Sequence, residues 1–322
     1  MLGNIDLTQL TRRSALLGLG GLGATAVLAA SATTGATSQK KSLNLNFAKP
    51  EDNLTAWVKL VGNLKDGEES CGYYSGVQYG DVGPQEVIKP LFRVQGFGMS
   101  RVTRLADGRY ENLHREVLYY LDLKEDRILD EWKNPLTGET VSVFQTHNDP
   151  VNSYYATSFR QTFGTKESGV QTVEFPFILP WEIFGDRAAV SFAVNTRWPT
   201  PLPPAKWPRE QFGDWYRTSE YFQLHASLAE LNDPDLLKVP YTGAWQKIAP
   251  WHPWMLMDNR PGGIVGITNV FSLNSVEQLP PHVLAYTEKN FPKYLHAPTT
   301  WTAPNMTTWE TFANERKPAK IP

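Results

Sequence analysis

Between residues 70 and 195 the chain is a series of short runs in which apolar and polar residues alternate, separated by tight turns. One run extends from Leu91 to Leu105, and the turn Ala106-Asp107-Gly108 leads into a second run from Tyr110 to Leu123. Alternation with a period of two indicates strands with one buried face. Turns this short join antiparallel neighbours, whereas parallel strands need a crossover helix between them. The sequence therefore predicts an antiparallel sheet.

Five more strand-like runs continue this pattern. They cover Arg127–Trp132, Thr140–Thr146, Tyr154–Thr162, Val170–Phe177 and Ala188–Asn195. Sequential strands with no helix between them favour a meander, and such a meander commonly closes into a barrel or half-barrel. The predicted fold class is mainly β with a few helices.

The other segments are expected to cover this sheet. Periodicity predicts short helices at 50–61, at 218–231 after an N-cap at Thr218 or Ser219, and at 281–290. The segment 197–215 is rich in Trp and Pro and cannot form a central strand, because proline lacks the backbone donor. Nine of the 11 Trp residues lie in the C-terminal half, between positions 181 and 309. We therefore predict a sheet covered by Trp/Pro-rich loops and short helices.

The first residues have the composition of an export signal. Arg12 and Arg13 are followed by a short glycine-rich apolar stretch that ends in Ala30-Ser31-Ala32. This pattern predicts a twin-arginine-type signal peptide over 1–32, and an uncleaved N-terminal anchor is the alternative. Residues 33–49 are expected to be a flexible linker and 50–322 a single β-rich domain. The expected partner is the twin-arginine export machinery of a bacterium, and the expected location is the periplasm or the exterior, with no membrane span in the mature chain.

Composition excludes several classes of protein. Lys and Arg number 31 against 33 Asp and Glu, so the formal net charge of −2 gives no field for holding nucleic acid. A single cysteine, Cys71, excludes a disulfide framework, a Cys₄ metal site and covalent haem attachment through paired cysteines. The chain also lacks G-x-S-x-G, H-E-x-x-H and Walker motifs. Function must therefore be sought in less specific combinations of residues.

The first such combination is His114-Arg115-Glu116, on the predicted return strand. A period of two places His114 and Glu116 on one face and Arg115 on the other. A His beside a carboxylate is suited to acid–base catalysis or to metal binding. The alternative is an ion pair on a wet sheet face. We treat His114 and Glu116 as candidate catalytic residues and Arg115 as a candidate substrate-binding residue.

A second combination, His147-Asn148-Asp149, lies where a strand ends before Pro150. Binding groups are often carried at such strand ends, although Asn and Asp are also ordinary turn-forming residues. We treat His147 and Asp149 as candidate catalytic residues and Asn148 as substrate-binding. If His147 met the His114 and Glu116 pair, the three would form the two-His-one-carboxylate set of a non-haem iron site.

The segment Trp251–Met257, Trp-His-Pro-Trp-Met-Leu-Met, is the densest apolar and aromatic run. It is suited to the wall of a pocket for a flat organic ligand, or to one side of a haem. An aromatic core plug held by prolines is the alternative. We assign Trp251, His252 and Trp254 to substrate binding together with Trp132. Non-haem iron, haem and the absence of any cofactor stay open.

These motifs resemble one known family. The chain is similar to the "domain of unknown function 1838" family in five segments. They are Leu91-Phe92 to Gly98, His114-Arg115-Glu116, Trp132–Glu139, His147–Val151 and Trp251–Met257. The resemblance extends over most of the mature chain. It brings an association with oxidative cleavage of aryl-alkenes, but no assigned catalytic residues.

Two functions are consistent with these observations. The first is an exported enzyme that acts on a hydrophobic, aromatic small molecule, with oxidation as the candidate chemistry. The second is a non-catalytic, barrel-like protein that binds an apolar ligand and uses its histidines structurally. The polar motifs at His114 and His147 exceed what an apolar receptor needs, so the sequence favours the enzyme.

Overall fold

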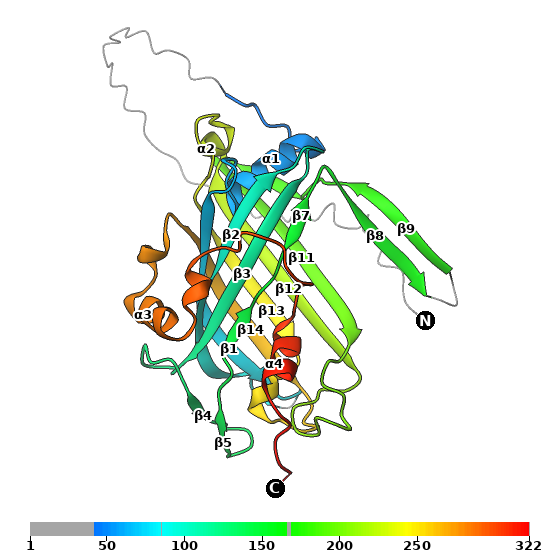
Figure 1. Cartoon of the computed structure of the whole chain (residues 1–322), viewed down its shortest axis with the longest axis vertical. Helices are drawn as coiled ribbons and strands as arrows, with labels where there is room; N and C mark the ends of the chain where they lie inside the picture. The colour runs from blue at the N-terminus through cyan, green and yellow to red at the C-terminus, as the bar shows by residue number, and fades with distance from the viewer. Residues whose placement is uncertain (1–41, 85, 166–168, 322) are drawn as a thin grey trace, which may run out of the picture. The chain divides into compact units, whose positions relative to one another are not determined.

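A ten-stranded antiparallel sheet is the scaffold in the computed structural model, which describes residues 42–84, 86–165 and 169–321 (Figure 1). The prediction of a mainly β, antiparallel fold is confirmed. All of the described residues belong to one compact unit. The predicted signal peptide (1–32) lies outside the described residues, and so do residues 33–41 of the predicted linker.

The strands and helices of the described residues have bounds that differ in part from the predicted ones. The strands are β1 (Glu69–Asp81), β2 (Lys89–Arg104), β3 (Tyr110–Leu121), β4 (Glu131–Lys133), β5 (Thr140–Ser142), β6 (Thr146–Asn148), β7 (Ser153–Tyr155), β8 (Ser158–Thr165), β9 (Gly169–Pro176), β10 (Trp181–Phe184), β11 (Arg187–Pro199), β12 (Trp215–Ser227), β13 (Tyr241–Ala249) and β14 (Gly263–Leu273). The helices are α1 (Pro50–Val61), α2 (Leu228–Asn232), α3 (Pro281–Asn290) and α4 (Thr308–Glu315), with the short 3₁₀ helices η2 (Pro253–Met255), η3 (Val276–Gln278) and η4 (Pro292–Leu295).

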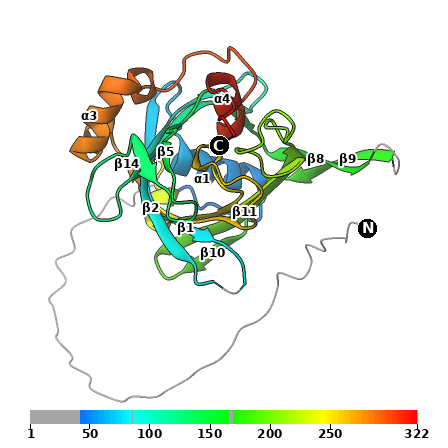
Figure 2. The same cartoon turned by 90° about the horizontal axis from the view of Figure 1, so that it is seen from below.

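The sheet consists of two meanders that meet in the middle. Its strand order is β10-β11-β12-β13-β14-β1-β2-β3-β6, and β7 also pairs with β3. The meanders β10 to β14 and β1 to β3 are joined where β1 pairs with β14, with Tyr74 opposite Val270. The sheet curves around a shared interior (Figure 2), and one buried cluster there contains both Phe92 of β2 and Tyr216 of β12. The curvature thus brings together residues from strands that are far apart in the sheet.

Helix α1 fills one end of this interior, and its predicted bounds are confirmed. Ala56 and Leu60 pack in one cluster with residues of β11 and β12, whereas Leu54 and Val58 pack with Val102 of β2. Opposite faces of one amphipathic helix therefore contact both meanders. Burial of these side chains, at about 25 cal/mol per Å² of apolar surface, holds the two halves of the sheet against a common plug.

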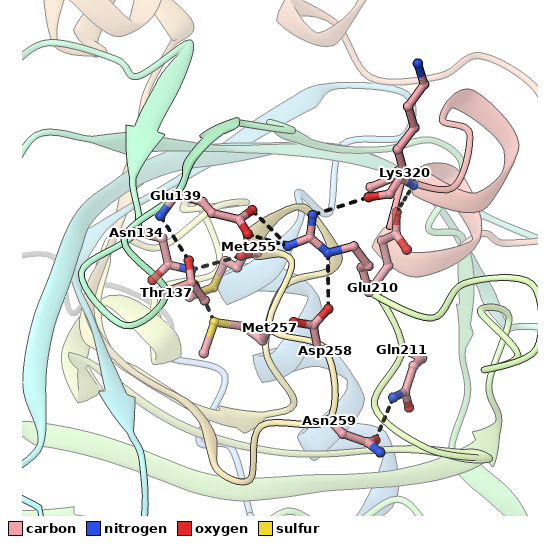
Figure 3. A network of polar contacts seen from close by, with 12 residues as sticks. Asn134, Thr137, Glu139, Glu210, Gln211, Met255, Met257, Asp258, Asn259 and Lys320 are labelled. Carbon is pink, nitrogen blue, oxygen red and sulfur yellow. Dashed lines mark hydrogen bonds and ion pairs between the residues drawn. The ribbon is translucent and has the colours of Figure 1, made fainter. Parts of the chain in front are cut away.

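Loops and an aromatic cluster fill the other end. The predicted Trp/Pro-rich loop is confirmed here as residues 200–214, shorter than predicted because β11 continues to Pro199. The buried Arg209 of this loop donates from Nη2 to both carboxylate oxygens of Glu139, at 2.9 and 2.8 Å, and from Nε to Asp258 Oδ1 at 3.1 Å. Figure 3 shows this network, in which Nη1 also donates to the carbonyl of Lys320. One guanidinium thus links four segments of the chain.

Helix α3 and the 3₁₀ helix η4 cover the outer face of β1 to β3. Helix α3, predicted correctly over residues 281–290, packs with Val283 among buried residues that include Phe97 and Tyr119. The phenol of Tyr119 also shares a hydrogen bond with Thr287 Oγ1 at 2.8 Å. This contact leaves the opposite, inner face of β3 free to line the interior.

The predicted helix over 218–231 is wrong. Residues 215–227 form strand β12, and only Leu228–Asn232 are helical, capped by Ser227 rather than by Thr218 or Ser219. The spacing of Tyr221, Leu224 and Leu228 matches a helical period by coincidence. Pairing with β11 on one side and β13 on the other supplies a full ladder that a helix here would forfeit.

Two predicted hairpins are separate from the main sheet. Strands β4 and β5 form one two-stranded sheet, and β8 and β9 form another, which projects from the scaffold (Figure 1). The predicted meander therefore included four strands that are not part of the main sheet. Strands β13 and β14, which carry no prediction above, complete the sheet instead.

Candidate functional site

The interior of the curved sheet holds a cavity of about 150 Å³. A neighbouring cavity of about 270 Å³ shares six of its lining residues: Glu116, Asn148, Glu220, Lys247, Thr308 and Trp309. We call the two cavities together the interior site. The first cavity has aromatic walls, supplied by Tyr74, Phe222, Trp245 and Trp309. Charged groups inside aromatic walls are the composition expected of a small-molecule site.

Strand alternation decides which side chains face the interior site. On β3, Glu116 lines the cavities, and His114, two residues earlier, lies on the same face of the strand. The intervening Arg115 therefore points to the opposite face. On the other meander, Glu220 of β12 is paired directly with Lys247 of β13. The curvature of the sheet places both strands along one cavity.

Lys247 is the cation of the interior site. Its Nζ lies 3.2 Å from Glu220 Oε1 and 5.8 Å from the ring centroids of both Trp245 and Trp309. Burial by itself lowers the pKa of Lys247, but attraction to Glu220 outweighs that effect and the pKa is raised. The ammonium is consequently charged at neutral pH and sits between two indole rings, an arrangement that adds cation–π attraction.

Glu116 is the carboxylate on the opposite wall. It accepts a hydrogen bond from Asn148 Nδ2 at 2.8 Å, and its Oε2 lies 3.8 Å from His114 Nε2. Burial raises the pKa of Glu116, but His114, Asn148 and the charge of Lys247 together outweigh burial and lower it. Glu116 is therefore ionised at neutral pH although burial opposes its charge.

The ring of His114 is positioned by its own neighbours. Its Nδ1 is 2.7 Å from Ser100 Oγ, directly across the β2–β3 ladder. Gly98 leaves room for the ring, because a Cβ atom at that position would lie 2.4 Å from His114 Cε1. A glycine inside a strand often marks such a close approach. The local sequence thus fixes the orientation of His114 toward Glu116.

A neutral network borders the other side of the cavity. His252 Nε2 lies 2.7 Å from Gln78 Oε1, and its Nδ1 lies 3.4 Å from the Tyr120 hydroxyl, which is also 3.1 Å from Thr146 Oγ1. The carboxamide oxygen accepts, so Nε2 carries the proton. Burial, followed by the charge of Lys247, lowers the pKa of His252 well below its usual value. Burial also raises the pKa of Tyr120 to about 12, so both rings are uncharged at neutral pH.

The second predicted combination lies on the outer side of β3. His147 is paired with Val117 and binds both carboxylate oxygens of Glu315 through Nε2, at 2.9 and 3.0 Å. Asp149 contacts Lys293 at 2.9 Å and Arg115 at 3.4 Å. These side chains join β3 and the turn after β6 to the segments that cover them. Of the predicted set, only Asn148 returns to the interior site.

The predicted iron ligands therefore do not converge. His114 and Glu116 face the interior, whereas His147 faces the outer surface and is held by Glu315. Among the described residues, no group of three or more His, Cys, Asp or Glu side chains is arranged to hold a metal ion. A haem also does not fit, because both nitrogens of His252 are engaged and the cavity beside it measures only about 150 Å³.

The predicted aromatic substrate residues Trp132, Trp251 and Trp254 all belong to the buried cluster. Trp132 and Trp254 pack against each other and against Phe92, with ring centroids 5.4 to 5.7 Å apart, in the cluster that plugs the end of the sheet. Trp251 lines a separate open groove of about 690 Å³. Only His252 of the assigned Trp251–Met257 residues borders the interior site. The plug alternative describes most of this segment.

The sequence did not predict the residues that the meander β10 to β14 and helix α4 contribute to the interior site. Glu220, Trp245 and Lys247 carry no prediction, and neither does Trp309 at the start of α4. A signal for the first of these was present: Tyr216, Thr218, Glu220 and Phe222 alternate as in a strand, but the competing helical spacing was preferred. No local pattern indicates that Lys247 and Glu116 share a cavity.

Comparison with known proteins gives one result. A family model described as "Protein of unknown function (DUF1838)" matches residues 67–316, a span that contains every residue of the interior site named above. No curated protein matches the chain. In the part of the chain that the structure describes, no helix is both long and apolar enough to cross a membrane.

Proposed function

The chain belongs to the DUF1838 family, and we propose that it is an enzyme that binds a flat, mainly apolar organic molecule in the interior site and acts on it by acid–base catalysis. One observation carries this proposal. An ionised carboxylate, Glu116, and a charged ammonium, Lys247, face the same aromatic-walled cavity. Charges are costly in such a place, and pKa shifts of this kind are concentrated at functional sites.

Each residue then has a distinct role. Glu116 accepts a proton from the bound molecule, and Lys247 stabilises the negative charge that develops there. His114 and Asn148 position the Glu116 carboxylate, while Ser100 positions His114. The aromatic walls hold the substrate and exclude water, which strengthens every electrostatic interaction within the cavity.

We also propose that the sheet works as a half-barrel whose open side is covered by a segment rather than by a strand ladder. Support comes from residues 305–309. Thr308 Oγ1 donates to Asn148 Oδ1 at 3.1 Å on the β6 side, and the Trp309 ring lies 5.0 Å from that of Tyr216 on β12. Export through the twin-arginine machinery to the periplasm stays part of the proposal on the strength of residues 1–32 alone.

The proposal contains no oxidation step. The residues suggested as iron ligands lie on opposite faces of the sheet, and among the described residues no other group of three or more His, Cys, Asp or Glu side chains is arranged to hold a metal ion. Acid–base chemistry needs only groups that are already in place.

The test separates binding from chemistry. The full chain is incubated with a pool of aryl compounds, and bound ligands and products are identified by native and liquid-chromatography mass spectrometry. For any compound that is converted, Glu116→Gln should lower turnover by roughly 10²–10⁴-fold while affinity changes by less than about threefold. Glu315→Gln, on the outer surface, is the matched control. Unchanged turnover in Glu116→Gln would refute the assignment of the base.

A receptor without turnover is the second candidate function. It is favoured by the four aromatic side chains around the cavity of about 150 Å³, which offer an apolar ligand a binding surface without any reacting group. The same experiment tests this candidate. It is supported if the wild-type chain retains a compound that neither the wild type nor any variant converts.

A further inference from the structure

Three hydrogen-bond donors at the interior site have no partner among the described residues. They are Trp309 Nε1, Trp198 Nε1 and Thr196 Oγ1, and each of these atoms is buried. All three residues line the cavity of about 270 Å³. A buried polar atom without a partner is uncommon in a folded protein and calls for an explanation. Three around one cavity point to a group that the cavity is built to receive.

The placement of these donors is a consequence of the fold. Thr196 and Trp198 are alternate residues of β11, so both lie on its inner face together with Val194, which lines the same cavity. Trp309 is the second residue of α4 and is only 2% exposed. The three residues thus border the cavity from β11 and from the segment that covers the open side of the sheet.

The chemistry of the donors and the charges selects the ligand. An indole N–H can only donate, so its partner must be an acceptor. The cavity already contains two carboxylates, Glu116 and Glu220, against one ammonium, Lys247. A ligand carboxylate would add a third negative charge in a poorly solvated space. A neutral acceptor oxygen avoids that repulsion.

We propose that the interior site recognises a neutral carbonyl compound, such as a ketone, ester or lactone, whose oxygen accepts hydrogen bonds from Trp309, Trp198 and Thr196. This inference rests on the proposed function and narrows its substrate class. Glu116 would then face the carbon atoms beside the carbonyl, and Lys247 would stabilise the enolate left when one of their protons moves to the Glu116 carboxylate. The reverse transfer returns that proton to carbon, so no other reactant is required.

The first measurement uses two probes of equal shape. Acetophenone carries a carbonyl oxygen where α-methylstyrene carries a methylene group. The indole N–H signals of Trp198 and Trp309, assigned in a ¹⁵N-labelled full chain with Trp198→Phe and Trp309→Phe, should move downfield with acetophenone and stay in place with α-methylstyrene. Equal displacement by both probes, or none by either, would overturn the inference.

The second measurement uses the affinity ratio of the two probes, from calorimetric titration. Thr196→Val removes a hydroxyl that has no partner in the protein, so folding is preserved. It should shift the ratio toward α-methylstyrene by about tenfold, the factor for 1.4 kcal/mol. Thr218→Val is the matched control, because Thr218 lines the same cavity but already donates to the Ile248 carbonyl at 3.2 Å. Its ratio should not change.

The outcomes separate the two proposals. If both probes bind but the ratio is equal in the wild type, Thr196→Val and Thr218→Val, the carbonyl inference fails and the small-molecule site stands. If neither probe binds and no aryl compound is retained or converted in the pooled assay, both proposals fail. Tighter binding of benzoate than of acetophenone would also overturn the inference, because it would show that the site prefers an anion.

Discussion

The two faces of strand β3 carry similar residues in different surroundings. On the inner face, Glu116 shares a cavity with Lys247 and is bonded to Asn148. On the outer face, Arg115 contacts Asp149, which is also paired with Lys293. Arg115 and Glu116 are neighbours in the sequence, and so are Asn148 and Asp149. The difference teaches that a motif such as His-Arg-Glu is divided by strand alternation into two sites that cannot act together.

Exposure distinguishes the lysine of each face rather than the two faces as a whole. The Lys247 and Glu220 side chains of the inner pair are 17% and 22% exposed. On the outer face Lys293 is 60% exposed, but its partner Asp149 is only 15% exposed. Water screens the Lys293 ammonium, so its pair with Asp149 contributes little free energy. Lys247 and Glu220 are poorly solvated, so each depends on its partner. The two faces differ in use because the inner charges line a cavity, whereas the outer charges join β3 to the segments that cover it.

The largest expected effect compares one lysine from each face. Lys247→Met leaves Glu220 partly buried without its cation, and we expect it to lower the free energy of unfolding by about 3 kcal/mol. Lys293→Met should lower it by less than about 1 kcal/mol, because Asp149 keeps Arg115 as a partner. Denaturant titration of both variants measures the difference. Equal losses would show that the two faces do not differ as described.

A second variant tests the close approach of Gly98 to the His114 ring on the inner face. Gly98→Ala introduces a Cβ atom 2.4 Å from the His114 ring, so the ring must move away from Ser100 and Glu116. We expect a loss of about 2 kcal/mol in the free energy of unfolding. Gly266→Ala is the control, because its Cβ would meet nothing closer than 3.6 Å. A stable Gly98→Ala variant with an unmoved His114 would contradict the described packing.

Half of the interior site follows from local sequence. A period of two placed His114 and Glu116 on one face of a predicted strand, and the hairpin turn at Asp107-Gly108 fixed their strand against β2. The antiparallel class followed from the short turns. The sequence also shows a glycine inside a predicted strand at position 98, but it does not show that this glycine faces the His114 ring.

The other half depends on long-range pairing that no local pattern contains. Glu116 and Lys247 are separated by 131 positions, and they meet only because β14 pairs with β1 and the sheet then curves. Strand β12 was also misassigned, since Tyr221, Leu224 and Leu228 match a helical period. Short apolar segments carry both periods at once, and tertiary pairing decides between them.

The pH dependence of the free energy of unfolding tests whether His252 is neutral in the native state. The native state holds His252 uncharged because its pKa is depressed by burial. The unfolded state binds a proton at this residue below its ordinary pKa of about 6.5, so stability must fall as the pH decreases below that value. The expected loss for this group is up to about 1.4 kcal/mol per pH unit.

His252→Gln provides the comparison for that pH dependence. The variant keeps a neutral, hydrogen-bonding side chain beside Gln78 but has no titrating ring. We expect the free energy of unfolding to depend less steeply on pH between about 5 and 6.5 in the variant than in the wild type. The midpoint of urea denaturation at several pH values measures both slopes. Identical slopes would mean that His252 is protonated equally in the two states.

The smallest expected effect tests the outer histidine. Glu315→Gln removes the charge that faces His147 but keeps an oxygen within reach of Nε2. Glu315 is half exposed, so the free energy of unfolding should fall by less than about 1 kcal/mol. Helix α4 also carries Trp309 into the interior site, and its capping box at Thr307 and Glu310 holds it independently of this pair. Acetophenone affinity should therefore be unchanged in calorimetric titration. A large drop in affinity would show that the two faces are coupled through α4.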